Sequence, residues 1–317
     1  MNLSEIEQLI SSPLTNFRQT YRTELDTATP LIGDVGRYLN DAPGKQLRPM
    51  LLMLSAGATH NDDVPSERLS VALEMLHNCT LLHDDVVDNS QLRHGRATVN
   101  RRWGNKTAVL CGDYFLARVM LMLNEINDPD INRIIDRTVM EMSTGELLQQ
   151  QRCQERDASE QNYYDTIRKK TASLMAACCE TGAIRTRWQS QMQEAGMHIG
   201  TAFQLRDDLL DFMPPAFTGK PTGNDIREHK LTLPLIAYLR TLSQGRRREI
   251  EKMLVQDPLP DQTVVHIVHN VVHSPAIQET QRAIAAQVAE ANAKLAFLDD
   301  SPFKEGLMQI TQQLVES

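Results

Sequence analysis

The chain of 317 residues is 41% hydrophobic and 23% charged, and its formal net charge is -8 at pH 7. This composition supplies a sizeable core and excludes a disordered chain. The negative charge argues against a nucleic-acid partner, because phosphate backbones are normally bound by a basic stripe. No break in composition divides the sequence, so we expect one domain over residues 1–317.

The five cysteines include no Cys-x-x-Cys pair and are expected to be small buried hydrophobes in a reducing compartment, not a disulfide framework or a zinc site. The first residues lack a basic region followed by an apolar run, and no stretch approaches the ~18 apolar residues that span a bilayer. We expect a cytoplasmic protein with no integral membrane segment, which is still compatible with a lipid-like substrate.

Apolar residues at helical spacing predict two helices over residues 3–39, interrupted near Pro13 and Pro30. A third helix is expected over residues 50–58, with Pro49 in its first turn.

Lys45 and Arg48 flank the predicted start of the third helix. Free backbone amides and the helix dipole favour an anion at such a position. A solvated basic turn is the alternative interpretation of these two residues.

The helix that follows carries three carboxylates, Asp84, Asp85 and Asp88, within an apolar pattern where an unpaired carboxylate is costly to bury. Residues four apart share a helix face, so Asp84 and Asp88 project side by side while Asp85 lies on the flank. Two like charges so close repel each other unless a cation lies between them. The pattern therefore predicts a cation at this cluster.

Other polar residues accompany this cluster. His77 lies on the face that leads to Asp84 and Asp88, so that a ligand-binding role and an ordinary interior position are both open. Arg93 and His94 follow at the end of the helix and place cationic groups beside the acidic ones.

Helical spacing continues without an alternating strand signal. Three more helices are expected, at residues 106–124, 131–151 and 163–183. A charged loop is expected between the last two, at residues 152–160. In the helix over 163–183, Lys169 and Lys170 precede a run of small apolar residues. Paired lysines on a helix are usually solvated, but this context directs at least one amine inward.

A second acidic cluster, Asp207, Asp208 and Asp211, repeats the spacing of the first on a helix predicted over residues 191–213, where Gln204 shares the face of Asp208. One such cluster suits a solvated helix end. Two copies with identical spacing in apolar surroundings do not.

The loop at residues 216–230 is rich in glycine and charge, as mobile active-site flaps and ordinary surface loops both are. Residues 264–272 are β-branched but keep helical spacing, and two more helices are expected over residues 280–315 around Pro302.

Carboxylates without accompanying cysteines or paired histidines suit a hard cation such as Mg²⁺, which bridges protein oxygens and substrate phosphates. Two facing clusters would hold several Mg²⁺ ions and grip a diphosphate between them. Basic side chains would neutralise the remaining charge, namely Lys45, Lys170, Lys220, Lys230, Arg48 and Arg93. The residues alone thus predict metal-assisted departure of a diphosphate.

Five ordered motifs carry a resemblance to a known family. They are Gly-Lys-Gln-Leu-Arg-Pro at 44–49, Leu-Leu-His-Asp-Asp-Val-Val-Asp at 81–88, Arg-His-Gly-Arg-Ala-Thr at 93–98, Lys-Thr at 170–171 and Gln-Leu-Arg-Asp-Asp-Leu-Leu-Asp at 204–211. The chain resembles the trans-isoprenyl diphosphate synthases over essentially its whole length, and most closely the bacterial long-chain polyprenyl group such as octaprenyl diphosphate synthases.

The resemblance implies an all-α fold of roughly a dozen helices around a deep apolar cavity, a homodimer, and Mg²⁺ as cofactor. It implies metal ligation by Asp84, Asp88 and Asp207, with Asp85, Asp208 and Asp211 in support, and catalysis by Asp84, Asp207 and Lys170. The implied contacts of the allylic diphosphate, expected to be farnesyl or geranylgeranyl diphosphate, are Arg93, Lys170, Thr171, Gln204 and Lys220. Those of isopentenyl diphosphate are Lys45, Arg48 and His77, with His94 and Lys230 as further substrate contacts.

Product length is expected to depend on the helix before the first acidic cluster. In the family, bulky aromatic residues there give short products, whereas this chain has Cys79 and Thr80, with Leu76 and Leu73 further along. We therefore expect an open tunnel and a product longer than C20, for quinone side chains. A C15–C20 synthase is the alternative.

Two residues depart from the family pattern. His94 replaces an arginine that contacts isopentenyl diphosphate, which would weaken that site and make it depend on pH near ~6.5, with Arg96 as a partial substitute. Arg206 replaces an aliphatic residue and either pairs with a neighbouring carboxylate or reaches out to solvent.

Two other functions share parts of this pattern. A terpene cyclase or head-to-head synthase would not need Lys45, Arg48 and His77. A catalytically weak subunit of a heteromeric synthase would be expected to lose aspartates, and this chain keeps all six; His94 is the feature that leaves this second alternative open.

Overall fold

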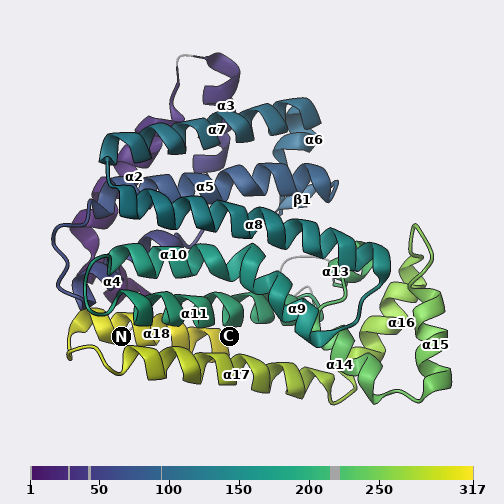
Figure 1. The fold of residues 1–317 in the computed structure, drawn as a ribbon. Helices are drawn as coiled ribbons and strands as arrows, with labels where there is room; N and C mark the ends of the chain where they lie inside the picture. Colours follow the sequence, from purple (N-terminus) through teal and green to yellow (C-terminus); the bar gives the residue numbers. More distant parts are fainter. Residues whose placement is uncertain (1, 28, 42–43, 94, 215–221, 317) are drawn as a thin grey trace. The chain divides into compact units, whose positions relative to one another are not determined.

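The computed structural model describes residues 2–27, 29–41, 44–93, 95–214 and 222–316. These residues are mostly helical (Figure 1), and the strands among them are β1 (Leu92–Arg93) and β2 (Arg96–Ala97), which pair antiparallel with Leu92 opposite Ala97. The expected all-α fold is confirmed.

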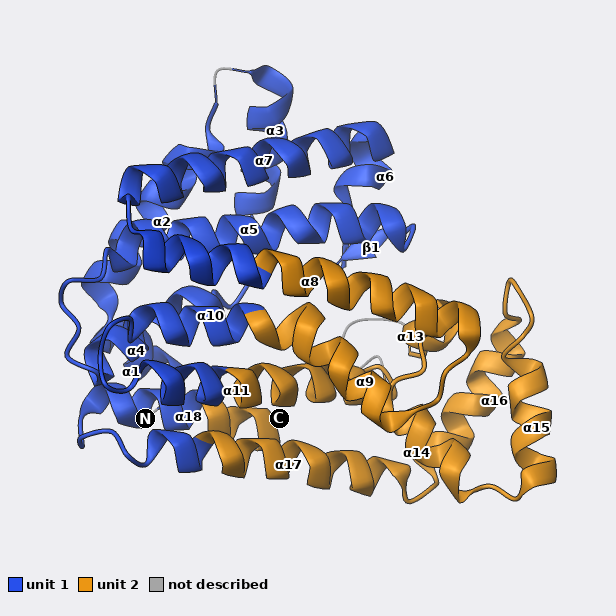
Figure 2. Ribbon diagram, in the orientation of Figure 1, with its two compact units in different colours: residues 1–138, 174–196, 292–310 blue, residues 139–173, 197–291, 311–317 orange. Residues whose placement is uncertain are grey.

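The chain forms two compact units (Figure 2). Unit 1 comprises residues 1–138, 174–196 and 292–310, and unit 2 comprises residues 139–173, 197–291 and 311–317. Each change from one unit to the other falls inside a helix.

The helices that lie wholly in unit 1 are α1 (Leu3–Leu9), α2 (Ser11–Leu25), α3 (Pro30–Asn40), α4 (Leu47–Ala58), α5 (Ser66–Val87), α6 (Val99–Trp103) and α7 (Asn105–Ile126). Those wholly in unit 2 are α9 (Glu160–Ile167), a π-helical turn (Arg168–Ala172), α13 (Asn224–Arg227), α14 (Leu233–Thr241), α15 (Gln244–Met253) and α16 (Asp261–Val272). Helices with residues in both units are α8 (Pro129–Glu155), α10 (Ser173–Gly182), α11 (Gln189–Leu210), α17 (Ala276–Leu295) and α18 (Pro302–Glu316).

The core of unit 1 is organised around α5, which packs along α7 and α4. Gly112 of α7 permits the close approach, because a Cβ there would lie 2.3 Å from Nε2 of His83 on α5. Helix α4 is apolar on almost every side, and its residues from Met50 to Leu54 are buried. Burial of these residues holds α5, and with it the first acidic cluster, in a fixed position.

The core of unit 2 gathers around α14, where Leu235 and Leu239 pack with Ile267 and Val271 of α16. Phe212, which follows α11, belongs to the same cluster. The β-branched segment at 264–272 is therefore a helix, as its spacing indicated. Its buried stripe outweighs the weak intrinsic preference of valine for strands.

Two predicted boundaries are wrong. Residues 3–39 form three helices and not two, since Pro13 lies in the first turn of α2, where its missing N–H is not needed. The charged segment at 152–160 is a loop only in part, because α8 continues to Glu155. Within the predicted loop at 216–230, the described residues include the short helix α13.

Helix α8 begins with a strong cap, and Asp128→Ala is expected to destabilise the protein by about 1–2 kcal/mol. Oδ1 of Asp128 accepts the backbone N–H groups of Asp130 and Ile131 at 3.0 and 3.3 Å, and Oδ2 accepts from Arg185 at 2.6 Å. The hydrogen bond from Arg185 lowers the pKa of Asp128, despite partial burial. The stabilisation is thus complete above the unfolded pKa of ~3.9 and is lost as the pH falls through the lower folded pKa.

Thermal unfolding of the parent and of the Asp128→Ala variant, at pH 7 and at pH 3, measures the stabilisation by the Asp128 cap. The unfolding midpoint of the variant should fall further below that of the parent at pH 7 than at pH 3. Asp136→Ala, which changes an exposed residue of the same helix, is the matched control and should leave the midpoint nearly unchanged. Equal midpoints for the Asp128 variant and the parent at pH 7 would contradict the prediction.

Among the described residues, α7 alone is long and apolar enough to cross a membrane by length and composition. The sequence analysis did not anticipate this helix as a candidate. Core helices pass the same test, and Phe115, Val119 and Met122 of α7 are buried.

Candidate functional site

The first acidic cluster lies at the C-terminal end of α5. Asp84 and Asp85 are in its last turn, and Asp88 is the C-cap, whose N–H donates to the carbonyl oxygen of Asp84 at 2.8 Å. Asp84 and Asp88 are half-buried, whereas Asp85 is 5% exposed. The helix therefore keeps two of the three side chains within reach of solvent.

Asp85 is held by the β1–β2 hairpin that follows. Nε and Nη2 of Arg93 donate to its Oδ1 at 3.0 and 2.8 Å, and the Asn100 amide donates to its backbone carbonyl at 3.0 Å. Burial lowers the pKa of Arg93, but the hydrogen bond to Asp85 and the charges of Asp84 and Asp88 outweigh it and raise this pKa above its ordinary value. Arg93 thus stays charged beside the cluster.

This end of α5 concentrates negative charge. Three carboxylates lie within about one turn, and the carbonyl end of the helix adds the negative pole of its dipole. Arg93 neutralises part of this charge through Asp85. The excess favours a further cation near Asp84 and Asp88.

Lys45 and Arg48 lie at the start of α4, as expected, but in different surroundings. Lys45 is exposed one residue before the N-cap Gln46. Arg48 lies inside unit 1 near Glu74 of α5, where burial lowers the pKa of Arg48 and raises that of Glu74, and each charge counteracts the other's shift. The two charges attract each other, but Nε of Arg48 and Oε2 of Glu74 are each buried without a hydrogen-bond partner among the described residues.

The residues predicted to set product length continue along α5 behind the aspartates. Thr80 lies one turn before Asp84 on the same face and is half-buried, while Leu76 continues the row and is buried. Cys79 lies on the neighbouring face and is 2% exposed. Burial, with the charges of Asp113 and Asp84, raises the pKa of the Cys79 thiol to about 12. His77, also on α5, is half-buried.

The second acidic cluster lies at the end of α11 in unit 2. Asp207 is exposed, Asp208 is 3% exposed, and Asp211 follows the last helical residue. Arg206 is half-buried; burial lowers its pKa, and Asp207 counteracts that shift.

Asp208 is anchored by two side chains. The Tyr163 hydroxyl donates to its Oδ2, and Nε2 of Gln204 donates to its Oδ1 at 2.7 Å. Burial raises the pKa of Asp208 to about 7, although the two hydrogen bonds act in the opposite direction. Gln204 also accepts the Thr171 hydroxyl at 2.8 Å, so the network reaches the π-helical turn.

Asp211 caps the segment that carries Lys230. Its two carboxylate oxygens accept the backbone N–H groups of Asn224 and Asp225, each at 3.0 Å. Burial and the charges of Asp211 and Asp208 raise the pKa of Asp225 well above its ordinary value. Lys230 donates to Glu228 at 2.7 Å and is half-buried.

The π-helical turn positions Lys170. A single π turn within a helical run is frequently found at functional sites. Nζ of Lys170 pairs with Glu146 of α8, and both side chains are about one-fifth exposed, at 21% and 23%. One amine is therefore directed inward, as expected from the apolar residues that follow it.

Gly145→Ala is expected to destabilise the protein and to displace this turn. A Cβ at residue 145 would lie 2.3 Å from the backbone N of Lys170 and 2.7 Å from its Cα, and neither atom can move without shifting the turn. Alanine otherwise favours a helix by about 1 kcal/mol over glycine, so a lower unfolding midpoint reports the clash.

Gly245→Ala is the matched control. A Cβ at residue 245 of α15 would meet no described atom within 4 Å, so this variant should keep or gain stability. Equal changes in the two variants would contradict the clash at Gly145.

His94 and Lys220, two predicted substrate contacts, lie outside the described residues. The sequence analysis missed four residues that contact a predicted site residue or interact with it electrostatically, namely Glu74, Glu146, Tyr163 and Asp225. Glu74 could have been predicted, because it is a carboxylate inside an apolar helical stretch. Tyr163 and Asp225 could not, because their partners are distant in sequence and no local pattern indicates these contacts.

The donors at both clusters fit Mg²⁺. They are carboxylate oxygens, and Mg²⁺ commonly binds one or two carboxylates together with substrate phosphates and water. Among the described side chains, no group of three or more His, Cys, Asp or Glu is arranged so that it could hold a metal ion by itself. Such a group is not needed for an ion that takes its other ligands from a diphosphate.

A sequence model of the polyprenyl synthetase family matches residues 29–271. The chain belongs to this family. The resemblance to trans-isoprenyl diphosphate synthases is thereby confirmed, and the protein is an enzyme of the prenyltransferase class.

The chain is 33% identical to the all-trans-nonaprenyl-diphosphate synthase (geranyl-diphosphate specific) of Rhodobacter capsulatus, over 91% of this chain and 90% of that one. It is 30% identical to the octaprenyl diphosphate synthase of Escherichia coli (strain K12), over 100% and 99% of the two chains. A polyprenyl synthase of Caulobacter crescentus CB15, solved with calcium and isoprenyl diphosphate, superposes with a TM-score of 0.93 at 30% identity, over 100% and 98%. The family model thus covers most of the chain, and these relatives align with it over at least 91% of its length.

Proposed function

We propose that the protein is a Mg²⁺-dependent synthase that elongates an allylic diphosphate by successive 1'-4 trans condensation with isopentenyl diphosphate. The product is longer than C20 and serves as a quinone side chain, and the reaction takes place in the cytoplasm. The observation that carries the proposal is the pair of half-buried carboxylates, Asp84 and Asp88, beside an aspartate that Arg93 already fixes. The long-chain relatives support the product class.

The reaction balances without a protein base. The C1–O bond of the allylic diphosphate breaks, and the electron pair leaves with the diphosphate. The double bond of isopentenyl diphosphate attacks C1, and a C–C bond forms. The resulting cation then loses a proton to the released diphosphate. Mg²⁺, when bound, supplies charge neutralisation that lowers the free energy of diphosphate departure.

The chain's own residues have distinct roles in this proposal. Asp84, Asp88 and Asp207 would hold the metal, because they are less buried than Asp208, whose two oxygens already accept hydrogen bonds. Lys170 contacts the leaving oxygens and stabilises the charge that develops on them. Asp208 acts as a positioning residue for Gln204.

Charge at the isopentenyl diphosphate site comes from Lys45 and Arg48, with His77 on the adjacent helix. The nearby charge of Glu74 raises the pKa of Arg48 and so favours its charged form, against the effect of burial. Isopentenyl diphosphate retains its own diphosphate throughout the reaction. Its binding site therefore does not need a metal ion to assist departure of that diphosphate.

The test is incubation of the purified chain with Mg²⁺, isopentenyl diphosphate and farnesyl or geranylgeranyl diphosphate, followed by sizing of the extracted product. Products longer than C20 that vanish with EDTA support the proposal. Products of C15–C20 would assign a short-chain synthase, and no elongation by the isolated chain would assign a subunit of a heteromeric synthase.

We also propose that two copies associate through α7. Its exposed apolar residues Val109, Leu110, Met120 and Leu121 share one helix face, and three of them are at least half exposed, at 55%, 60% and 50%. The exposed Asp113 lies between the two pairs, and exposed apolar residues gathered on one helix face in this way are typical of a protein–protein contact.

Leu121→Asp is expected to convert the dimer to a monomer, because it places a charge in the apolar contact. Sedimentation velocity gives the mass. Phe297→Asp, which changes another exposed apolar residue outside α7, should leave the dimer intact. A parent protein that sediments as a monomer would overturn the proposed association.

A further inference from the structure

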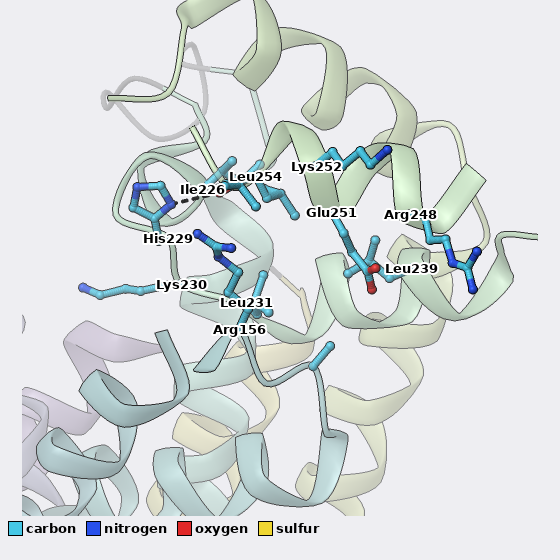
Figure 3. A pocket seen from close by; sticks show the side chains of 12 residues that line it. Arg156, Ile226, His229, Lys230, Leu231, Leu239, Arg248, Glu251, Lys252 and Leu254 are labelled. Atoms are coloured by element: carbon cyan, nitrogen blue, oxygen red, sulfur yellow. Dashed lines mark hydrogen bonds between the residues drawn. The ribbon is translucent and has the colours of Figure 1, made fainter. Parts of the chain in front are cut away.

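Unit 2 contains a pocket of about 480 Å³ between α15, the end of α14 and the segment after α13 (Figure 3). Its apolar wall includes Ile226, Leu239 and Leu254, which are buried, and Leu231, which is half-buried. This volume lies within the ~300–1,000 Å³ of most small-molecule sites. The pocket thus offers apolar surface in a space large enough for a ligand.

Exposed cations lie at two ends of this apolar wall. Arg156, Arg248 and Lys252 line the pocket and form no ion pair with any side chain that the structure describes. Other basic residues on the same helix are neutralised, since Arg246 donates to Glu249 at 2.6 Å and Arg247 to Glu251 at 2.7 Å.

The local charge is therefore unbalanced. Arg248 and Lys252 are four apart on α15, where like charges repel. The carboxylate on the pocket wall, Glu251, is already bonded to Arg247. An anion in the pocket would relieve the repulsion between the cations and gain charge-assisted hydrogen bonds from their side chains.

One edge of the pocket is held in place by His229. Its Nδ1 lies 3.2 Å from the carbonyl oxygen of Leu254, which joins the segment after α13 to the end of α15. Figure 3 shows the guanidinium group of Arg156 close to His229 and the apolar side chains of Leu231 and Leu254 beside it. Cationic and apolar groups therefore line the same space.

A ligand that matches both properties has an anionic head and a hydrocarbon chain. We propose that this pocket binds a second isoprenoid diphosphate molecule, in addition to the one that reacts, with its diphosphate on Arg248 and Lys252 of α15 and its chain on the wall of Leu231, Leu239 and Leu254. The choice of an isoprenoid chain rests on the proposed function. Such a molecule would report the supply of substrate or product at a place outside both acidic clusters.

The experiment measures binding without turnover. Radiolabelled farnesyl diphosphate is dialysed to equilibrium against the full chain carrying Asp84→Asn and Asp207→Asn, in EDTA and an excess of unlabelled isopentenyl diphosphate, so that metal-dependent binding is removed and the proposed site at Lys45 and Arg48 is filled. We expect one ligand per chain. Inorganic pyrophosphate, which lacks the chain, and farnesol, which lacks the head, should each bind at least about 10-fold more weakly.

Matched variants locate the site. Arg248→Ala and Lys252→Ala should each weaken binding of farnesyl diphosphate about 10-fold, as expected for the loss of a charge-assisted hydrogen bond. Arg246→Ala removes an arginine of the same helix that is paired with Glu249, and it should leave the affinity unchanged.

Three outcomes overturn the proposal: no metal-independent binding, equal affinity in the Arg248 and Arg246 variants, or co-sedimentation with phosphatidic acid vesicles that depends on Arg248, which would assign the pocket to a membrane lipid. Failure of the proposed function is distinguished by the parent chain, whose elongation activity in Mg²⁺ is measured separately. If the chain binds farnesyl diphosphate in EDTA but does not elongate it in Mg²⁺, the proposed binding pocket stands and the proposed reaction is wrong.

Discussion

Asp84→Asn is expected to lower kcat for chain elongation by about 10²–10³-fold while leaving the fold intact. The substitution keeps the size of the side chain and removes its charge. Asp84 is half-buried at the negative end of the α5 dipole, one turn from Asp88, and such a carboxylate contributes most when it shares a cation with the leaving group. Incorporation of radiolabelled isopentenyl diphosphate at saturating substrate measures the effect.

A Mg²⁺ titration separates this effect from simple loss of folding. The variant should need a higher Mg²⁺ concentration for half-maximal rate, and its unfolding midpoint should stay near that of the parent. Asp62→Asn, an exposed aspartate in the turn before α5, is the control and should retain full activity. An Asp84 variant with parental kcat and Mg²⁺ dependence would remove the first acidic cluster from the mechanism.

Thr80→Phe is expected to shorten the product from a long polyprenyl chain to about C15–C20, with a smaller effect on the rate of the first condensation. Thr80 is half-buried one turn behind Asp84 on the same face of α5, and Leu76 lies a further turn behind it. The growing chain is expected to extend along the face of α5 that carries Thr80 and Leu76. An aromatic ring at residue 80 would occupy that space. Chromatographic sizing of the products measures the change.

Cys79→Phe provides a contrast on the neighbouring face. Cys79 is buried at 2% exposure, so the ring would overpack the core at a cost of about 1–3 kcal/mol. Its main effect should be a lower unfolding midpoint. Thr23→Phe, on an exposed position of α2, controls for added bulk and should change neither property. Unchanged product length in the Thr80 variant would contradict the placement of the tunnel along α5.

The sequence allowed the helices and both acidic clusters to be located because their signals are local. Aspartates four apart on an apolar helix, and apolar residues at helical spacing, are readable over a few turns. The misplaced break near Pro13 arose because proline is unfavourable inside a helix but harmless in its first turn.

The partners of the site residues were harder to predict from sequence. Tyr163 is separated from Asp208 by 45 positions, and Glu146 reaches Lys170 only because α8 passes the π-helical turn at Gly145. Such contacts depend on how helices pack, and no local pattern encodes them. The pocket of unit 2 was invisible for the same reason, since its cations and apolar wall come from separate segments.

The bond between Arg93 and Asp85 has a thermodynamic consequence for ligand affinity. Together with the Asn100 amide, it commits the end of α5 and the hairpin to one arrangement while the chain folds. The conformational entropy lost in ordering these residues is then a cost of folding and does not recur at each catalytic cycle. In the proposed reaction, repeated condensation on one growing chain would benefit from this rigidity, since every round would begin from the same arrangement of charges.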